Sequence, residues 1–362
     1  MKKTNKLSQE ERKQSVVFFL VAFAFSFLMG IGIFIGKRKG VDINSFANFH
    51  MMTPALGVAL AMVITKKEDR LLPKKAFIAY IVISLAMAIL AWIPIFRPSF
   101  NAYMASAALV SLGAIIFFIA LYSESKETKL AYGLSLGPVK KILGAAGIFL
   151  ILYFLRFAIL TIIEEGPKGL GQNFTPPKLL LVPVLILNFF LSYLPFLGEE
   201  YGWRYFLQPF LQEKLGMWKG LFALGIIWGL WHLPLNLFYY SAPGTEALSL
   251  INQIVICIAY SVFIAFAYGY TRSIWAPVVI HYVNNNFILF FVDLKNLSNP
   301  DLLQNQVYTW HSVIIMALVN LVIFVPFILT KYNKDKSLSP KRPMKRRKDV
   351  ELALCRTEEE MV

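Results

Sequence analysis

Charged residues are scarce in this chain, and those present stand in short clusters between long apolar runs. Only 16% of the 362 residues are charged, whereas 57% are hydrophobic. A helix on the surface of a soluble protein keeps one face polar, so its apolar runs are interrupted every few residues. Here the runs reach about 20 residues, which is the length that spans the ~30 Å hydrocarbon core of a bilayer. The composition excludes an ordinary soluble domain and predicts an all-α, polytopic transmembrane helical bundle.

Cysteine is almost absent, and basic residues outnumber acidic ones. Cys257, inside an apolar run, and Cys355, near the C-terminus, are too few and too poorly placed for a disulfide framework or a cysteine metal site. The net charge of +15 comes from Lys and Arg that flank the apolar runs and from a cluster at 341–348. This pattern follows the positive-inside bias of membrane proteins rather than a basic face on a folded domain. We therefore expect contact with the lipid bilayer and no nucleic-acid partner.

The apolar runs predict about ten transmembrane helices, with both termini on the same side. That side would hold most of the 36 Lys and Arg residues, so we expect a multi-pass plasma-membrane protein with cytoplasmic termini. The first run is too long for a signal peptide and is expected to be retained. The cluster Lys37 to Lys39 falls on the opposite side, so the first hairpin fits least well. The predicted spans are 15–36, 46–65, 76–96, 103–122, 142–163, 179–198, 218–240, 249–270, 274–293 and 311–330.

Polar residues divide the chain into unequal parts. Residues 1–165 form an N-terminal region of five helices with no assigned role, and a loop rich in Gly and Pro follows. Almost all polar chemistry falls in residues 178–295. The last helix lies in 296–330, and the basic cytoplasmic tail, 331–362, is expected to be disordered and near anionic lipid. The sequence does not indicate an oligomeric state.

Two adjacent carboxylates, Glu199 and Glu200, directly follow an apolar run. On a helix, Glu200 and Arg204 share a face at a spacing of four residues, in the favourable order for an ion pair. Glu199 is left without that partner. An unpaired carboxylate next to an apolar run is suited to act as a general base. The alternative is an interfacial charge cluster that merely ends a helix. Glu164 and Glu165 also follow an apolar run, but no arginine lies four residues beyond them.

His232 lies about two thirds of the way along an otherwise apolar span. Pro234 cannot donate a hydrogen bond to the carbonyl group of Leu230, so we expect a kink or opening beside the histidine. An intramembrane histidine sometimes makes only a hydrogen bond between helices. Its cost in lipid nevertheless favours a functional role.

His281 and Asn285 form a third pair at a spacing of four residues, in the ninth predicted span. This spacing points an imidazole and a carboxamide into one space, where both can donate to a developing oxyanion. Asn284 and Asn286 point elsewhere and are expected to join hydrogen bonds between helices.

Three further polar residues receive structural interpretations. His50 and His311 stand near the ends of their spans and are expected to be interfacial. Arg156, alone inside the fifth span, needs an acidic or carbonyl partner that the sequence does not identify.

The three motifs, in this order on three spans, resemble those of the CAAX-processing and bacteriocin-processing (CPBP or Abi) intramembrane protease family. The resemblance covers about residues 180 to 295, and the first half of the chain shares none of it. The second motif usually carries phenylalanine where this chain has tryptophan. The matching residues are Glu199, Glu200 and Arg204, then Trp228 and His232, then His281 and Asn285.

This resemblance implies a hydrolase that resembles CAAX prenyl protease 2, with water as the nucleophile. Glu199 and His232 would activate the water, and His281 with Asn285 would stabilise the oxyanion. Glu200 belongs to the same catalytic set, fixed by Arg204, while Trp228 provides packing support. The expected substrate is a peptide or a membrane-anchored protein.

A metal is the open alternative, because one glutamate and two histidines also form a plausible catalytic zinc set. The set would be Glu199, His232 and His281, although the H-E-x-x-H spacing of common zinc proteases is absent. We favour a mechanism without a cofactor.

The four catalytic groups must meet, although the simple span limits place them at different depths. Either Pro195 breaks the sixth span, so that the helix carrying Glu199 lies within the membrane, or the seventh helix starts later than predicted. We expect convergence on a polar cavity open to the cytoplasmic half. Two other functions compete with a protease. One is a non-catalytic bacteriocin-immunity or regulatory membrane-binding protein; the other is a transporter, for which no inverted repeat is found.

Overall fold

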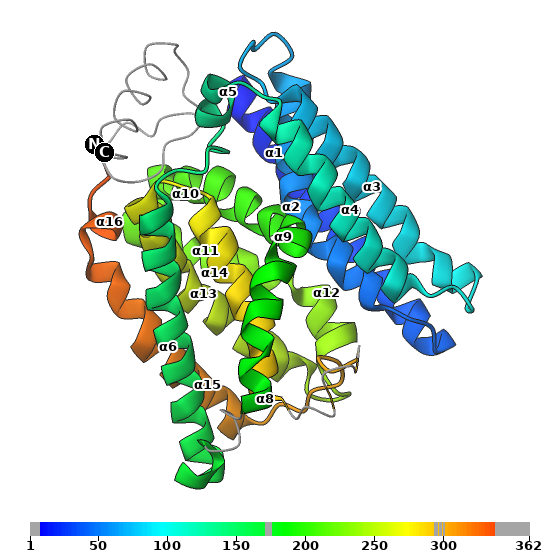
Figure 1. The fold of residues 1–362 in the computed structure, drawn as a ribbon, viewed down its shortest axis with the longest axis vertical. Helices are drawn as coiled ribbons and strands as arrows, with labels where there is room; N and C mark the ends of the chain where they lie inside the picture. Colours follow the sequence, from blue (N-terminus) through cyan, green and yellow to red (C-terminus); the bar gives the residue numbers. More distant parts are fainter. Residues whose placement is uncertain (1–7, 171–175, 293–295, 297–298, 300, 337–362) are drawn as a thin grey trace.

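The structure is a computed structural model that describes residues 8–170, 176–292, 296, 299 and 301–336. Its regular elements are helices, and no β-strand occurs in this part of the chain. The predicted all-α membrane bundle is confirmed (Figure 1). In chain order, the longer elements are α1 (Gln9–Lys39), α2 (Asn44–Thr65), α3 (Lys74–Phe96), α4 (Ala102–Tyr122), α6 (Val139–Glu165), α9 (Leu181–Glu200), α11 (Met217–Trp231), α13 (Glu246–Thr271), α14 (Trp275–Asn286) and α15 (Trp310–Phe324).

Short helices connect or extend these elements. Two of them are π-helices close to motif residues: η2 (Tyr201–Leu207) directly follows Glu200, and η3 (Asn236–Tyr240) begins four residues after His232. The other short elements are α5 (Lys126–Ala131), η1 (Pro167–Gly169), α8 (Pro176–Leu179), α10 (Gln208–Leu215), α12 (Leu233–Leu235), η4 (Phe287–Phe291), η6 (Val325–Leu329) and α16 (Lys331–Lys334). Of the predicted tail, residues 331–336 are described and begin with α16, while 337–362 lie outside the described residues.

The prediction of ten spans needs correction. Within the described residues, eight helices are long and apolar enough to cross a bilayer, or nine if the bent pair Met217–Trp231 and Leu233–Tyr240 counts as one span. The ninth predicted span is shorter than expected, because α14 ends at Asn286 and only η4 extends it. The start of α1 and the short α16 still lie at the same end of the bundle (Figure 1).

The helices form two groups that do not follow the division of the chain at residue 165. Helices α1 to α4 lie together on one side of the molecule (Figure 1). Helix α6 instead packs against α13, α14 and α15, and α9 contacts both α2 and α14. Helices α1 to α4 are called the N-terminal layer below. Helix α9, which carries the first motif, therefore lies between this layer and the rest of the bundle.

The basic cluster at the end of α1 is held by contacts at its own end of the bundle. Lys37 Nζ donates to Asn305 Oδ1 at 2.7 Å, and Lys39 Nζ donates to the carbonyl oxygen of Ile95 at 3.0 Å. The Arg38 guanidinium lies 4.4 Å from the centroid of the Phe34 ring. Each of the three cations at the end of α1 therefore has a partner within the protein.

Glycines allow the helices around the motifs to approach closely. A Cβ atom on Gly225 would lie 2.4 Å from the Cα of Ile258, and one on Gly229 would lie 2.6 Å from the Cα of Ile254. These glycines are four residues apart on α11, so both face α13. Small residues at this spacing bring membrane helices into backbone contact.

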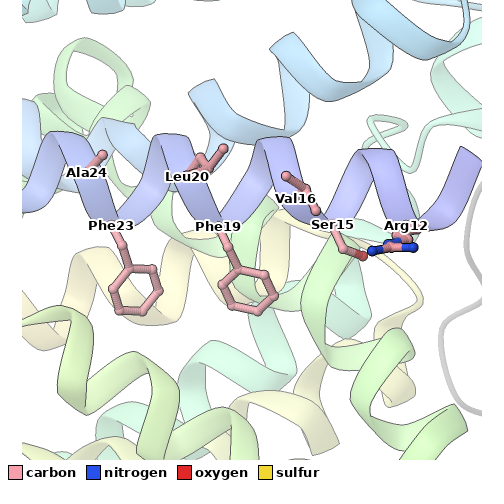
Figure 2. A pocket seen from close by; sticks show the side chains of 7 residues that line it. All are labelled: Arg12, Ser15, Val16, Phe19, Leu20, Phe23 and Ala24. Carbon is pink, nitrogen blue, oxygen red and sulfur yellow. The ribbon is translucent and has the colours of Figure 1, made fainter.

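A groove of about 620 Å³ runs along α1, away from the motif residues. Figure 2 shows Phe19 and Phe23 on the same side of α1, with Arg12 and Ser15 toward the start of the helix. The lining also includes Val16, Leu20 and Ala24. None of these residues belongs to the three motifs, so the groove is a feature of the α1 surface.

The close approach of α11 to α13 predicts an asymmetry among Gly→Ala substitutions. Gly225→Ala and Gly229→Ala should each destabilise the protein by about 1–3 kcal/mol, because backbone atoms of α13 must move. Gly147→Ala in α6 is the matched control, since nothing lies within 4 Å of its added Cβ. It should stabilise the helix by roughly 0.5–1 kcal/mol. Thermal unfolding in detergent measures all three; equal shifts would contradict the packing described.

Candidate active site

Glu199 and Glu200 are the last two residues of α9, and both are buried. The sequence suggested that this helix ends near Leu197 or breaks at Pro195, and it does neither. It continues through η2 and α10, so that Leu181–Leu215 is one helical span. The carboxylates consequently lie within a span rather than at its end.

Two glycines set the position of this carboxylate pair. A Cβ atom on Gly198 would lie 2.5 Å from the carbonyl oxygen of Met51, and one on Gly202 would lie 2.3 Å from the Cβ of Pro54. Both glycines therefore let α9 and η2 press against the backbone of α2. The glutamates between them are held where α9 meets α2.

The Glu200 carboxylate joins two motifs. Its Oε2 accepts from Arg204 Nε at 2.9 Å, which is the ion pair predicted from the spacing of four residues. Its Oε1 accepts from His281 Nδ1 at 2.8 Å. Because a carboxylate oxygen accepts, Nδ1 of His281 carries a proton and Nε2 faces away from Glu200. The sequence predicted the first contact but not the second, which connects the end of α9 to α14.

Arg204 extends this network to neighbouring helices. Its Nη1 donates to Ser261 Oγ on α13 at 3.3 Å, and its guanidinium lies 4.8 Å from the centroid of the Trp228 ring on α11. The side chain is fully buried. Arg204 therefore fixes Glu200 and also ties together the elements that carry the other motifs.

Trp228 contacts Glu199 directly. Its indole Nε1 donates to Glu199 Oε2 at 2.8 Å. The sequence suggested only a packing role for this position, since phenylalanine is usual there. Tryptophan has an N–H group that phenylalanine lacks, and this difference was the signal for a hydrogen bond to a motif carboxylate.

His232 lies at the break that Pro234 predicted. Helix α11 ends at Trp231, and the chain bends by 42° into Leu233–Tyr240. Nδ1 of His232 lies 2.8 Å from the carbonyl oxygen of Trp228, so this nitrogen is the donor and Nε2 carries the lone pair. The His232 carbonyl oxygen accepts both from the backbone N–H of Asn236 and from Asn236 Nδ2, each at 2.9 Å.

The Trp228 side chain is the common neighbour of the motif residues. Its ring centroid lies 5.7 Å from that of His281 and 6.1 Å from that of His232. The same side chain binds Glu199 and stacks below Arg204. The structure thus brings the three motifs around one indole. Among the described contacts, no direct hydrogen bond links Glu199 to either histidine.

Asn285 stands apart from this cluster. It lies one turn beyond His281 on α14, as predicted, but its side chain is exposed. Its Oδ1 accepts from Asn284 Nδ2 at 2.8 Å. Asn286 Nδ2 donates to the Tyr282 carbonyl oxygen within the same helix rather than across helices. The pairing of Asn285 with His281 at an oxyanion remains a prediction.

His50 is buried, so its interfacial interpretation was wrong. Its ring stacks on Trp231 with centroids 3.6 Å apart, and its centroid lies 5.9 Å from that of His232. The sequence motifs lie in the second half alone and did not reveal this neighbour from α2. The cost of placing a histidine in an apolar span was the available signal. His311, by contrast, is exposed at the start of α15.

Arg156 finds partners that carry no negative charge. Its Nη1 donates to the hydroxyl group of Tyr260 at 2.5 Å and lies 3.4 Å from Asn320 Oδ1. Its guanidinium lies 4.9 Å and 4.3 Å from the ring centroids of Tyr153 and Phe157. Aromatic faces and hydrogen bonds stabilise this buried cation, which agrees with a structural role.

The arrangement of the candidate donor side chains bears on the metal alternative. A catalytic zinc site needs about three protein ligands around one point. Among the described residues, no group of three His, Cys, Asp or Glu side chains is arranged to hold an ion. Glu199, His232 and His281 lie around Trp228, and the choice between a zinc set and a mechanism without a cofactor stays a prediction.

Comparison with protein families identifies the segment that carries these motifs. Residues 179–287 match the family described as Type II CAAX prenyl endopeptidase Rce1-like. Searches of curated proteins and of solved structures found no match. The matched segment contains all three motifs and agrees with the resemblance noted in the sequence. Residues 179–287 are therefore similar to the Rce1-like type II CAAX prenyl endopeptidase family, in agreement with the resemblance to the CPBP or Abi proteases.

Proposed function

We propose that the protein is an intramembrane endopeptidase that hydrolyses peptides or membrane-anchored proteins. The observation that supports this most directly is the arrangement of Glu199, His232 and His281 around Trp228, with Glu200 bound to His281. A binding protein has no need of a carboxylate and two imidazoles buried around one indole. The family match supports the same reaction class.

In the proposed reaction, Glu199 takes a proton from water, and the water oxygen attacks the scissile carbonyl carbon. Trp228 holds Oε2 of Glu199, which leaves Oε1 to receive the proton. The lone pair on Nε2 of His232 can accept the second water hydrogen and orient the nucleophile. The C–N bond then breaks, and the proton held by Glu199 passes to the leaving amine.

His281 and Asn285 would stabilise the oxyanion. Since Nδ1 of His281 already donates to Glu200, donation to an oxyanion through Nε2 requires a second proton on the ring. The resulting imidazolium would face the Glu200 carboxylate, and Arg204 holds the other oxygen of that carboxylate. In this scheme Glu200 acts through His281, and Asn285 supplies a second donor from one turn along α14.

We also propose that the protein lies in the plasma membrane, with both termini cytoplasmic and the site open to the cytoplasmic half. Substrates would reach it from the bilayer or from that side. The competing proposal is a non-catalytic immunity or regulatory protein that binds a membrane partner. The two proposals differ in whether Glu199 matters chemically.

Glu199→Gln separates catalysis from binding, because it keeps a similar shape but removes the base. We expect peptide release to fall by about 10²- to 10⁴-fold, the usual contribution of a general base. The measurement compares peptide profiles of membranes that contain the parent protein or the variant, by mass spectrometry. Glu165→Gln is the matched control, since it alters an exposed carboxylate pair that also follows an apolar run. Unchanged profiles with Glu199→Gln, alongside a lost phenotype, would favour the binding protein.

Glu200→Gln should act on stability more than the Glu199 substitution does. It leaves the buried Arg204 without its carboxylate, and breaking a buried ion pair costs about 3–5 kcal/mol. The double variant Glu200→Gln with Arg204→Met removes both charges and should recover part of that loss. Thermal unfolding of the purified variants measures both effects. An unfolding temperature unchanged by Glu200→Gln would contradict a stabilising role for the Glu200–Arg204 ion pair.

Metal chelation tests the choice between the two mechanisms. Because the motif residues surround an indole rather than a shared point, hydrolysis should persist after dialysis against a strong chelator. The assay follows the peptides whose release depends on Glu199. Loss of activity that returns on adding Zn²⁺ would instead support a metal held by Glu199, His232 and His281.

A further inference from the structure

Two helices of the N-terminal layer, α1 and α2, form hydrogen bonds at the helix break that carries His232. Trp231 is the last residue of α11, and its carbonyl oxygen accepts from Ser26 Oγ at 3.1 Å and lies 3.2 Å from Nε2 of His50. The Trp231 indole donates to the carbonyl oxygen of Ala22 at 3.1 Å. Helices α1 and α2 thus make all three of these contacts with the residue that precedes His232.

The same side of α1 presses on the other side of the break. A Cβ atom on Gly30 would lie 2.7 Å from the Cβ of Pro234. The bend therefore has hydrogen bonds from Ser26 and His50 before it and a close contact between Gly30 and the Pro234 ring after it. Such a break is costly in a membrane unless neighbouring groups satisfy its freed carbonyl groups.

The hydrogen bonds determine which nitrogen of His50 carries the proton. A carbonyl oxygen only accepts, so Ser26 gives its single hydroxyl hydrogen to Trp231. Nε2 of His50 then donates toward Ser26 Oγ, at 2.7 Å, and toward the Trp231 carbonyl oxygen. Nδ1 of His50 is left as a buried lone pair without a hydrogen-bond partner among the described residues.

His50 also reaches His232 through the aromatic side chain between them. Its ring stacks on Trp231 at 3.6 Å, and the Trp231 ring meets the His232 ring edge-on at 4.8 Å. Trp231 and His232 are adjacent in the chain, so a shift of the Trp231 carbonyl group turns the His232 backbone. The imidazole of His232 moves with it and changes where Nε2 points.

We infer that His50, supported by Ser26, is a positioning residue for His232. It holds the Trp231 carbonyl group so that the break in α11 keeps one geometry and Nε2 of His232 faces the reacting water. This inference rests on the proposed peptidase function, because it assigns a role in that reaction to the N-terminal layer. His50 itself touches neither the water nor the substrate.

Nitrogen NMR of the full-length protein in lipid tests the inference without any activity assay. The chain has only four histidines, so ¹⁵N-histidine labelling gives a small set of resonances to assign. The parent should show His50 protonated on Nε2 and His232 protonated on Nδ1. His50→Leu should shift the His232 resonances and leave those of His311 unchanged. A folded His50→Leu protein with unaltered His232 resonances would overturn the inference.

His50→Gln supplies the conservative comparison. The glutamine Nε2 lies as far along the side chain as the imidazole Nε2 and retains a donor for the Trp231 carbonyl group. It should restore the His232 resonances that His50→Leu disturbs. If His50→Leu does not fold, Ser26→Ala decides, because it removes one hydroxyl group from the same carbonyl; unchanged His232 resonances in this variant would also overturn the inference.

Kinetics of the Glu199-dependent peptide release give the second readout. His50→Leu should lower kcat by about 10- to 100-fold, as displaced catalytic groups do, with KM within about twofold of the parent. In a His232→Ala background, the same substitution should change the residual rate by less than about twofold, since the residue that it positions is gone. If His50→Leu lowered kcat in the His232→Ala background by the same 10- to 100-fold factor, a role through His232 would be refuted.

The matched control for these kinetics is His311→Leu, which removes an exposed histidine and should leave kcat unchanged. Failure of the proposed function has a different signature from failure of the inference. If the parent protein shows no Glu199-dependent release, the peptidase proposal fails, while the NMR comparison still decides whether His50 positions His232.

Discussion

The Glu200 carboxylate is a buried negative charge inside a helical membrane span, and two donors share it. Arg204 binds one oxygen and His281 binds the other. A carboxylate taken from water into such surroundings must have all its oxygens satisfied, or it destabilises the fold by several kcal/mol. Because the donors come from η2 and α14, satisfying this charge determines how the first and third motifs face each other. The positions of His281 and Arg204 follow from it.

The second constraint is the close approach of backbones at small residues. Gly198 and Gly202 bring α9 onto α2, while Gly225 and Gly229 bring α11 onto α13. Trp228 lies on the α11 face between these contacts and can reach Glu199 with its indole N–H. Helices separated by larger side chains would place that N–H too far from the carboxylate. The hydrogen bonds of the site therefore depend on packing at positions that carry no polar chemistry.

Local spacing predicted the contacts that lie within one helix. The ion pair of Glu200 with Arg204 follows from the helical repeat, and the bend at His232 follows from the missing donor of Pro234. Contacts between helices were not predictable in this way, because one sequence carries no information on which faces meet. The bonds of Glu200 to His281, Trp228 to Glu199 and Ser26 to Trp231 belong to this second kind. The limit of the sixth predicted span, 179–198, was also wrong. Pro195 stands in α9 without ending it, and the helical span continues to Leu215.

The break in α11 also bears on the order in which the protein is made. Helices α1 and α2 leave the ribosome long before α11, and chains generally fold from the N-terminus during synthesis. The hydroxyl group of Ser26 and the imidazole of His50 are thus in the membrane before the Trp231 carbonyl group arrives. Helices α1 and α2 are therefore in place as a template when His232 arrives, so that the bent helix has donors for its freed carbonyl group from the moment it enters the bilayer.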